Sequence, residues 1–351
     1  MAFLAYERLR EVHLEPTTRC QLRCPMCPRT GEDGAPNRAV PMADLAAEDA
    51  LAVLPPELLQ RLEQVTLCGN YGDPIWAPEL LALVDGLRSR APRLRLSLHT
   101  NGSGREPSFW RALAEARVRV RFGIDGLADT LGRHRRGADF ERVMAGCRAF
   151  IAAGGKATWQ LILFEHNEHQ EEACRELAAA MGFSRFVVKR TKRFFKARYY
   201  PQKPGAGRDY GARPKLPIYE GGRLVDHLAP PTNDPARLTA ARSFTKLRDG
   251  GAIDCRAARE DSVYLSAEGL VLPCCWLGEL YAGDRRGRPG QLTDLLAPHG
   301  GLDALRAPPQ SLAAIMAGPI FAEIAARWAC TSLAAGRLET CARTCGRGPD
   351  G

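Results

Sequence analysis

The sequence predicts an α/β protein built on a parallel sheet. Short apolar strands alternate with helical patterns six times before residue 190, and each repeat spans about 30 residues. Strands joined in this way form a sheet covered by helices, with right-handed crossovers. Six units are fewer than the eight of a closed barrel, so a partial barrel and an open doubly wound sheet both fit. The 351 residues allow one large domain, or a large and a small one.

Each expected strand is a short apolar run. The strands span residues 12–15, 65–68, 95–99, 118–124, 158–164 and 185–188. In open and barrel-shaped parallel sheets alike, ligands bind beyond the carboxyl ends of the strands. The loops that follow these strands are therefore the expected place of function.

Each expected helix lies between two of these strands. The helices span residues 43–53, 56–62, 78–88, 107–116, 140–153 and 168–181. Several begin with a capping residue or a proline in the first turn, as in Glu106-Pro107-Ser108. After about Lys189 the alternation stops, which predicts the end of the α/β region.

The composition bounds the cellular setting. The first residues lack a long apolar run and a cleavage site, which argues against a signal peptide. No stretch approaches the roughly 18 apolar residues of a membrane helix. We therefore expect a cytoplasmic protein with no membrane contact. Its 12 cysteines are then better candidates for metal ligands than for disulfides.

The net charge of +9 is concentrated in one segment. Residues 189–215 hold ten Lys or Arg and one Asp, or +9, which leaves 39 basic and 39 acidic residues elsewhere. The surrounding stretch, 190–250, is rich in Pro and Gly and carries the aromatic residues Phe194, Phe195, Tyr199, Tyr200 and Tyr210. It is interpreted as a linker or insertion, either simply solvated or able to stack bases and bind an acidic substrate.

Three cysteines lie in the loop directly after the first expected strand. Cys20, Cys24 and Cys27 form a C-x3-C-x2-C pattern. Three thiolates on one loop can bind three irons of a 4Fe–4S cube, and no fourth cysteine lies nearby in the sequence. One iron would then stay open to a small-molecule ligand. Half of a zinc site, or chance, is the alternative for this motif alone.

This arrangement resembles the radical S-adenosylmethionine (radical SAM) superfamily. The resemblance implies a partial (β/α)6 TIM-like barrel, an open iron that binds the amino and carboxylate groups of S-adenosylmethionine, and reductive cleavage to a 5′-deoxyadenosyl radical. Met26 stands where the family often has an aromatic residue. An electron donor such as flavodoxin or ferredoxin is also implied.

The loop after the second strand supports the resemblance. Gly72, Asp73 and Pro74 match the end of the family's Gly-Gly-Glu-Pro segment, with Asp in place of Glu. The resemblance implies that this loop binds the amino group of S-adenosylmethionine.

Later loops supply further cofactor candidates. Asn101 follows the third strand, and Asp125 follows the fourth, where it would meet the ribose or the substrate. Asp125 as a plain turn residue is the alternative. Among Arg133, Arg135 and Arg136, one is expected to pair with the cofactor carboxylate, with Arg136 as the chosen candidate.

A second cysteine group follows the linker. Its members are Cys255, Cys274, Cys275, Cys330, Cys341 and Cys345. Residues 262–265 and 270–272 predict a hairpin that turns at Glu268-Gly269 and brings its ends together. The spacing resembles the SPASM or twitch extension of radical SAM enzymes, which implies an auxiliary 4Fe–4S cluster.

The closing half of this group departs from the longer SPASM pattern, so we expect one auxiliary cluster rather than two. The predicted ligands are Cys255, Cys274, Cys341 and Cys345, and a zinc site is the main alternative. Cys275 and Cys330 are held in reserve and are candidate hydrogen donors for catalysis. Cys68, Cys147 and Cys174 are interpreted as packing residues.

The predicted organisation has three parts: a radical SAM partial barrel at 1–190, a basic linker at 191–253 and a small cysteine-rich iron–sulfur domain at 254–351. The expected reaction is oxidative modification of a peptide or small metabolite, by dehydrogenation, cross-linking or epimerisation. Because the cluster loop begins near residue 20, no leader-binding domain is expected ahead of the barrel. An RNA-modifying enzyme is an alternative, although nucleic acid is the less favoured partner. A non-enzymatic iron–sulfur or zinc module is another.

Overall fold

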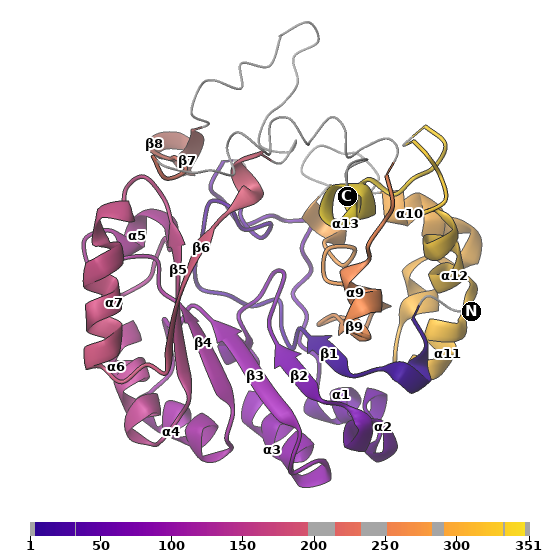
Figure 1. The fold of residues 1–351 in the computed structure, drawn as a ribbon, viewed down its shortest axis with the longest axis horizontal. Coiled ribbons are helices and arrows are strands. Elements are labelled where there is room, and N and C mark those ends of the chain that lie inside the picture. Colours follow the sequence, from indigo (N-terminus) through magenta and orange to yellow (C-terminus); the bar gives the residue numbers. More distant parts are fainter. Residues whose placement is uncertain are drawn as a thin grey trace, which may run out of the picture.

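The computed structural model describes residues 4–31, 33–195, 215–232, 251–282, 291–332 and 334–347. Its centre is an eight-stranded sheet with the order β10-β9-β1-β2-β3-β4-β5-β6 (Figure 1). The six predicted strands are β1 (Glu11–Leu14), β2 (Gln64–Leu67), β3 (Arg95–Thr100), β4 (Arg119–Gly123), β5 (Ala157–Leu163) and β6 (Arg185–Arg190). They are parallel and follow one another in chain order. The sheet is curved and open, as a partial barrel requires.

Helices cover the outer face of the sheet. They are α1 (Ala47–Val53), α2 (Pro56–Arg61), α3 (Leu80–Arg90), α4 (Pro107–Glu115), α5 (Leu131–His134), α6 (Phe140–Ala152) and α7 (Glu171–Ala180). Alternate strand residues, such as Val12 and Leu14 of β1, are buried beneath them. Trp110, Phe122 and Phe150 fill the space between β4, α4 and α6. The strand residues that alternate with the buried ones face the inside of the sheet. Their side chains therefore determine how polar the interior is.

Two predicted helices differ at their starts. The helix expected from residue 43 begins at Ala47, because Ala43 N–H donates to the Thr18 hydroxyl and Leu45 N–H donates to the Pro16 carbonyl. These bonds tie residues 43–45 to the loop after β1. The helix expected over 168–181 starts as a 3-10 turn, Glu168–Gln170, before α7.

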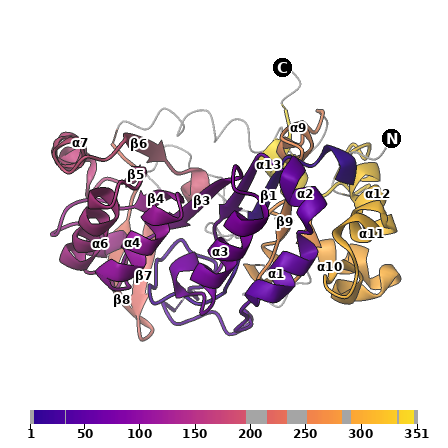
Figure 2. The ribbon, with the colours of Figure 1, turned by 90° about the horizontal axis from the view of Figure 1, so that it is seen from below.

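The predicted hairpin forms from β9 (Ser262–Leu265) and β10 (Val271–Leu272). It extends the barrel sheet, since β9 pairs in parallel with β1, with Glu11 opposite Ser262 and Leu14 opposite Leu265. The sheet therefore continues across the proposed boundary at residue 254, and the three-part division stays a prediction. The remaining C-terminal helices are α9 (Arg256–Arg259), α10 (Gln291–Leu296), α11 (Leu312–Ala317), α12 (Pro319–Ala326) and α13 (Glu339–Cys345). Figure 2 shows α10, α11 and α12 gathered beyond the β9 edge, away from α4, α6 and α7.

The basic segment contains a hairpin that the sequence analysis missed. It consists of β7 (Leu216–Glu220) and β8 (Arg223–Leu228). The turn residues Gly221 and Gly222 have φ of 55° and 77°, which suits the two-glycine hairpin turn. A Gly-Gly pair between alternating apolar residues is the signal that was overlooked.

The start of the same segment packs into the protein. Phe194 is buried in a small apolar cluster with Met26, Phe164, Ile218 and Leu228. Phe194 therefore serves the core and is not available to stack a base. The expectations for Tyr199, Tyr200 and Tyr210 fall outside the described residues. Among the helices that are described, none is long and apolar enough to cross a membrane.

Candidate active site

The three N-terminal cysteines lie on an irregular loop at the carboxyl end of β1. Cys24 is buried, Cys20 and Cys27 are partly buried, and Cys27 N–H donates to the Cys24 carbonyl at 3.0 Å. Burial, together with the nearby Asp73 and Cys24, raises the pKa of Cys20. Within the described residues, no three His, Cys, Asp or Glu side chains are grouped so that they could hold a metal ion. Three interacting thiols on one loop nevertheless fit the donor set of a cluster with one open iron.

Arg135 joins the cluster loop to the loop after β4. Its guanidinium donates to Cys24 and to Asp125, with Nε 2.6 Å from Oδ2. Asp125 is fully buried and also accepts from His134 and from Ile162 N–H, at 2.7 and 2.8 Å. Burial alone would raise the pKa of Asp125, but the Arg135 cation and the His134 hydrogen bond lower it to about 2. Asp125 is thus an ion-pair partner inside the protein.

The other two arginines point elsewhere. Arg136, the chosen candidate for the cofactor carboxylate, pairs with Glu220 of β7. Arg133 makes two bonds to Asp226 of β8, at 2.8 and 2.9 Å. Both therefore fasten the β7–β8 hairpin, and only Arg135 reaches a cysteine of the cluster loop.

Asp73 links the loops after β2 and β3. It caps a 3-10 turn, Pro74–Trp76, by accepting from Ile75 N–H at 3.2 Å, and it accepts from Asn101 N–H at 2.7 Å. Asn101 in turn places its side-chain nitrogen 3.7 Å from the Cys20 sulfur. Burial raises the pKa of Asp73. The structure thus brings Asp73 and Asn101 together beside the cluster loop.

Gly72 permits the closest approach in this region. A Cβ at this position would lie 1.9 Å from the Thr17 carbonyl oxygen, so only glycine fits against the start of the cluster loop. The following N–H, that of Asp73, donates to the Arg19 carbonyl at 2.8 Å. The segment from Gly72 to Pro74 is therefore fixed directly against the cysteine motif.

The part of the chain that carries these loops has a family match. Residues 14–177 match the family model described as the radical SAM superfamily.

These residues form a radical SAM domain. Among curated protein sequences, none matches the chain.

Solved structures share the fold. Streptococcus suis SuiB bound to precursor peptide SuiA is similar over 90% of this chain and 66% of that chain, with 13% identity and a TM-score of 0.56. The same protein bound to S-adenosylmethionine is similar over 77% and 61%, with 15% identity and a TM-score of 0.50. Native anSMEcpe with bound AdoMet and Cp18Cys peptide is similar over 90% and 82%, with 14% identity and a TM-score of 0.52. The chain thus spans less than two thirds of the length of SuiB.

The radical SAM domain contains one site residue that the sequence analysis missed. Glu15, at the end of β1, is buried and accepts from Tyr71 N–H at 2.8 Å and from Gly72 N–H at 3.0 Å. It also accepts from the Tyr264 hydroxyl of β9. Burial raises the pKa of Glu15. This carboxyl group therefore holds the loop after β2, and a single acidic residue at a strand end gives no local signal of that role.

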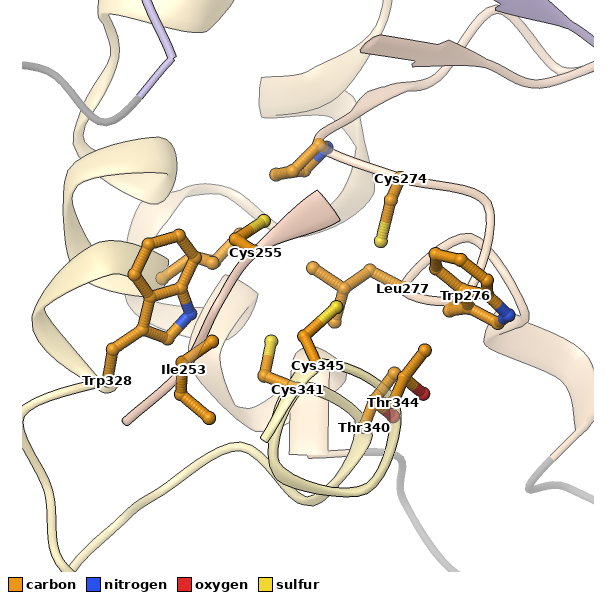
Figure 3. A pocket seen from close by; sticks show the side chains of 12 residues that line it. Ile253, Cys255, Cys274, Trp276, Leu277, Trp328, Thr340, Cys341, Thr344 and Cys345 are labelled. Carbon is orange, nitrogen blue, oxygen red and sulfur yellow. The ribbon is translucent and has the colours of Figure 1, made fainter. Parts of the chain in front are cut away.

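Four of the C-terminal cysteines surround one pocket beside the radical SAM domain. Cys255 precedes α9, Cys274 follows β10, and Cys341 and Cys345 lie on α13. The two on α13 are four residues apart and so share one face of the helix. Figure 3 shows the four thiols directed toward a common space. These are the four residues predicted as auxiliary-cluster ligands.

The walls of this pocket are mainly apolar. They include Ile253, Leu277, Ile324 and Trp328. Within it, the hydrogen bond from Cys255 lowers the pKa of the Cys345 thiol, while burial raises the pKa of Cys341 to about 11. Four sulfurs in an apolar shell are a suitable donor set for an iron–sulfur cluster or a zinc ion.

The reserve cysteines lie outside this pocket. Cys275 lines a second, larger cavity together with Cys68. The carbonyl of Cys330 accepts from Arg337 at 3.1 Å, and Cys330 is not among the described residues that line either cavity. Cys147 and Cys174 are fully buried in α6 and α7, as predicted for packing residues. Cys68 differs from that prediction, because it faces the interior of the sheet.

Proposed function

We propose that this radical SAM enzyme holds a 4Fe–4S cluster on Cys20, Cys24 and Cys27, which when bound cleaves S-adenosylmethionine reductively to a 5′-deoxyadenosyl radical that takes a hydrogen atom from the substrate. The observation that carries the proposal is the placement of three thiols at the carboxyl end of β1, with Asn101 beside Cys20 and Arg135 bonded to Cys24. The side chains of the following loops thus converge on the motif.

The surrounding residues have separable roles in this proposal. Gly72, Asp73 and Pro74 form the loop that binds the amino end of S-adenosylmethionine. Asp73 accepts from the N–H groups of Ile75 and Asn101 and from the Thr100 side chain, which leaves one lone pair for the cofactor. Asn101 orients toward the cluster loop because Asp73 holds its backbone. Glu15 holds Gly72 in place by accepting a hydrogen bond from its N–H.

We assign Arg135, rather than Arg136, to the cluster. A guanidinium that donates to a thiol favours the thiolate form, which is the form that binds iron. Arg136 is paired with Glu220, and Asp125 is paired with Arg135. Each of them could contact the cofactor only if its ion pair breaks. The arrangement favours Asp125 as the residue that positions Arg135.

We further propose one auxiliary 4Fe–4S cluster on Cys255, Cys274, Cys341 and Cys345. All four thiols line one pocket, which supports full coordination by protein. Full coordination suits acceptance of the electron left after hydrogen abstraction better than binding of the substrate. A net two-electron oxidation of the substrate follows, by dehydrogenation or cross-linking. Epimerisation is the alternative: it is redox-neutral for the substrate, because a donor such as the Cys275 thiol returns a hydrogen atom to the substrate radical and no electron passes to the auxiliary cluster.

The proposed substrate is a peptide or a small metabolite. Two proteins of similar fold have been solved with peptides, SuiB with SuiA and anSMEcpe with Cp18Cys. This favours a peptide as the substrate of the present chain. Flavodoxin or ferredoxin is the proposed electron donor. The cytoplasm, where such donors occur, is the proposed location.

The test is anaerobic reconstitution followed by reduction without substrate. We expect about eight irons per chain, and slow formation of 5′-deoxyadenosine and methionine, measured by liquid chromatography and mass spectrometry. A fully loaded protein that forms no 5′-deoxyadenosine with dithionite or with reduced flavodoxin would refute the enzyme assignment. About four irons with one zinc would refute the auxiliary cluster alone.

A further inference from the structure

The interior of the sheet contains a cavity of about 720 Å³. This volume falls within the usual range of small-molecule sites, roughly 300–1,000 Å³. It extends from the first residues of the strands, such as Glu11 and Arg185, to Cys68 and Cys275 near the carboxyl ends. The cavity therefore reaches from the amino-terminal edge of the sheet toward the loops that carry the cysteine motif.

Polar side chains line this interior. His13, Thr66, Ser97, Arg121 and Thr158 come from five successive strands, at positions that alternate with the buried apolar residues. A closed barrel of this type is usually filled by branched apolar side chains. The interior is therefore not filled by apolar side chains, and its polar groups can form hydrogen bonds with a ligand.

The lining is also strongly cationic. Its charged members are Arg95, Arg119, Arg121, Lys156, Arg185 and Arg256 against Glu11 and Glu260. Arg256 is neutralised by Glu260 at 2.8 Å, and Arg95 lies 4.0 Å from Glu63. In the ranges that the structure describes, no carboxylate lies within ion-pair distance of Arg119, Arg121, Lys156 or Arg185. Four cationic groups are therefore left for a ligand.

Strand register gathers these four groups. Ser97 is opposite Arg119, and Val120 opposite Ala157 places Arg119 beside Lys156. One layer further in, Arg121 is opposite Thr158, which is opposite Arg185. The cations and the hydroxyl groups of Ser97 and Thr158 thus form two adjacent layers at the amino-terminal half of the interior.

The same cations act on neighbouring titratable groups. Burial, followed by Arg121, lowers the pKa of His99 to about 3. Burial, followed by Arg121 and Arg256, lowers the pKa of Lys189. Arg121 is partly buried, whereas Arg119, Lys156 and Arg185 are exposed at the amino-terminal mouth of the cavity. Cations gathered at one mouth repel one another, and a bound anion removes that repulsion.

We propose that this interior binds an oxyanion group of the substrate, a phosphate or a carboxylate, between Arg119, Arg121, Lys156 and Arg185. The inference rests on the proposed function for its link to the reaction, and it specifies the substrate class as anionic. The substrate lies with its anionic end at the amino-terminal edge and its reacting end toward the cysteine loop. Guanidinium groups suit this task because they bind phosphate or carboxylate through two parallel hydrogen bonds.

Isothermal titration calorimetry of the reconstituted protein tests the proposal without S-adenosylmethionine. Pyrophosphate and citrate are the two probes, and the tighter one identifies the oxyanion as phosphate or carboxylate. We expect Arg121→Gln to weaken binding of the preferred probe by about tenfold or more, equivalent to about 1.4 kcal/mol. Arg121→Lys, which keeps the charge, should retain most of the affinity.

Arg111→Gln is the matched control, because Arg111 is exposed on the outer helix α4. It should bind the probe as the wild type does. Absence of binding of both probes to the wild type, or equal binding by Arg121→Gln and the wild type, would overturn the inference. Formation of 5′-deoxyadenosine is measured separately, so loss of that activity with probe binding intact would refute the proposed function alone.

Discussion

The two cysteine sites differ in how many thiols the protein supplies and in what surrounds them. The N-terminal loop supplies three, next to polar groups from other loops, among them Arg135 and Asn101. The C-terminal pocket supplies four, within walls that include Ile324 and Trp328. In metal sites generally, a complete protein ligand set is typical of structure or electron transfer, while an incomplete set leaves a position for reactants. The comparison supports the proposal that the first site is catalytic and that the second accepts an electron.

The same comparison extends to how each site is held. The N-terminal loop depends on buried carboxyl groups that follow three strands: Glu15 after β1, Asp73 after β2 and Asp125 after β4. The C-terminal site has two of its thiols on one short helix, α13, and two at the ends of the segment that contains the hairpin. Electrostatic positioning should therefore affect the first site much more than the second.

The largest expected effect is the loss of chemistry in Cys24→Ala. Removing one of only three thiolates destroys the cluster, so 5′-deoxyadenosine formation should fall below detection and about four irons per chain should be lost. Both are measured on the same anaerobic preparation. Cys147→Ala, at a buried position in α6, is the control and should keep both. Substantial 5′-deoxyadenosine from Cys24→Ala would mean that another residue completes the site.

Cys274→Ala should separate the two sites. It removes one of four thiols from the pocket, so about four irons should be lost while cleavage of S-adenosylmethionine without substrate continues. Substrate turnover should stop if the auxiliary cluster accepts the second electron. Cys174→Ala, buried in α7, is the matched control. Normal turnover by Cys274→Ala would reduce the auxiliary site to a structural role.

A smaller effect is expected for Asp73→Ala. The change removes a buried carboxylate that holds Asn101 and faces the proposed cofactor loop, so the Kd for S-adenosylmethionine should rise about tenfold or more, with iron content unchanged. Equilibrium dialysis measures the affinity, and iron analysis is done in parallel. Asp85→Ala, exposed on α3, is the control. Loss of iron from Asp73→Ala would show that this residue supports the cluster loop rather than the cofactor.

Local sequence patterns predicted the β–α order, because alternating apolar residues must face the outer helices whatever the final topology. They did not predict that β9 pairs with β1, since that contact joins segments about 250 residues apart and depends on how the whole chain folds. The same patterns place the hairpin in a separate C-terminal domain, and that division stays a prediction.

The site shows the same limit. The spacing of Cys20, Cys24 and Cys27 predicts the cluster loop, because ligands on one loop leave a local signature. The choice between Arg135 and Arg136 depends on how the chain leaves α5, and neighbouring residues point in different directions there. Glu15 had no local signature, because its partners Tyr71 and Tyr264 come from other parts of the chain.

The smallest expected effect concerns the stability of the first site. The pKa of Asp125 is about 2 in the folded protein and 3.8 in its ordinary state. A depressed pKa means that the unfolded chain binds more protons, so the stabilisation is present above pH 4 and is lost as the pH falls toward 2. The difference between the two pKa values corresponds to about 2 kcal/mol in the free energy of unfolding. Urea unfolding of the metal-free protein between pH 5 and pH 2 measures it, since acid destroys iron–sulfur clusters.

Asp125→Asn isolates this contribution from those of the other carboxyl groups, because it keeps the shape of the side chain and removes the charge. Above pH 4 it should be less stable than the wild type by at least this amount, since the partly buried Arg135 is left without its anion. The gap between the two proteins should narrow as the pH falls toward 2. A gap that stays constant over this range would show that the Arg135–Asp125 pair contributes nothing through its charge, and that the N-terminal loop is held, like the C-terminal pocket, by packing.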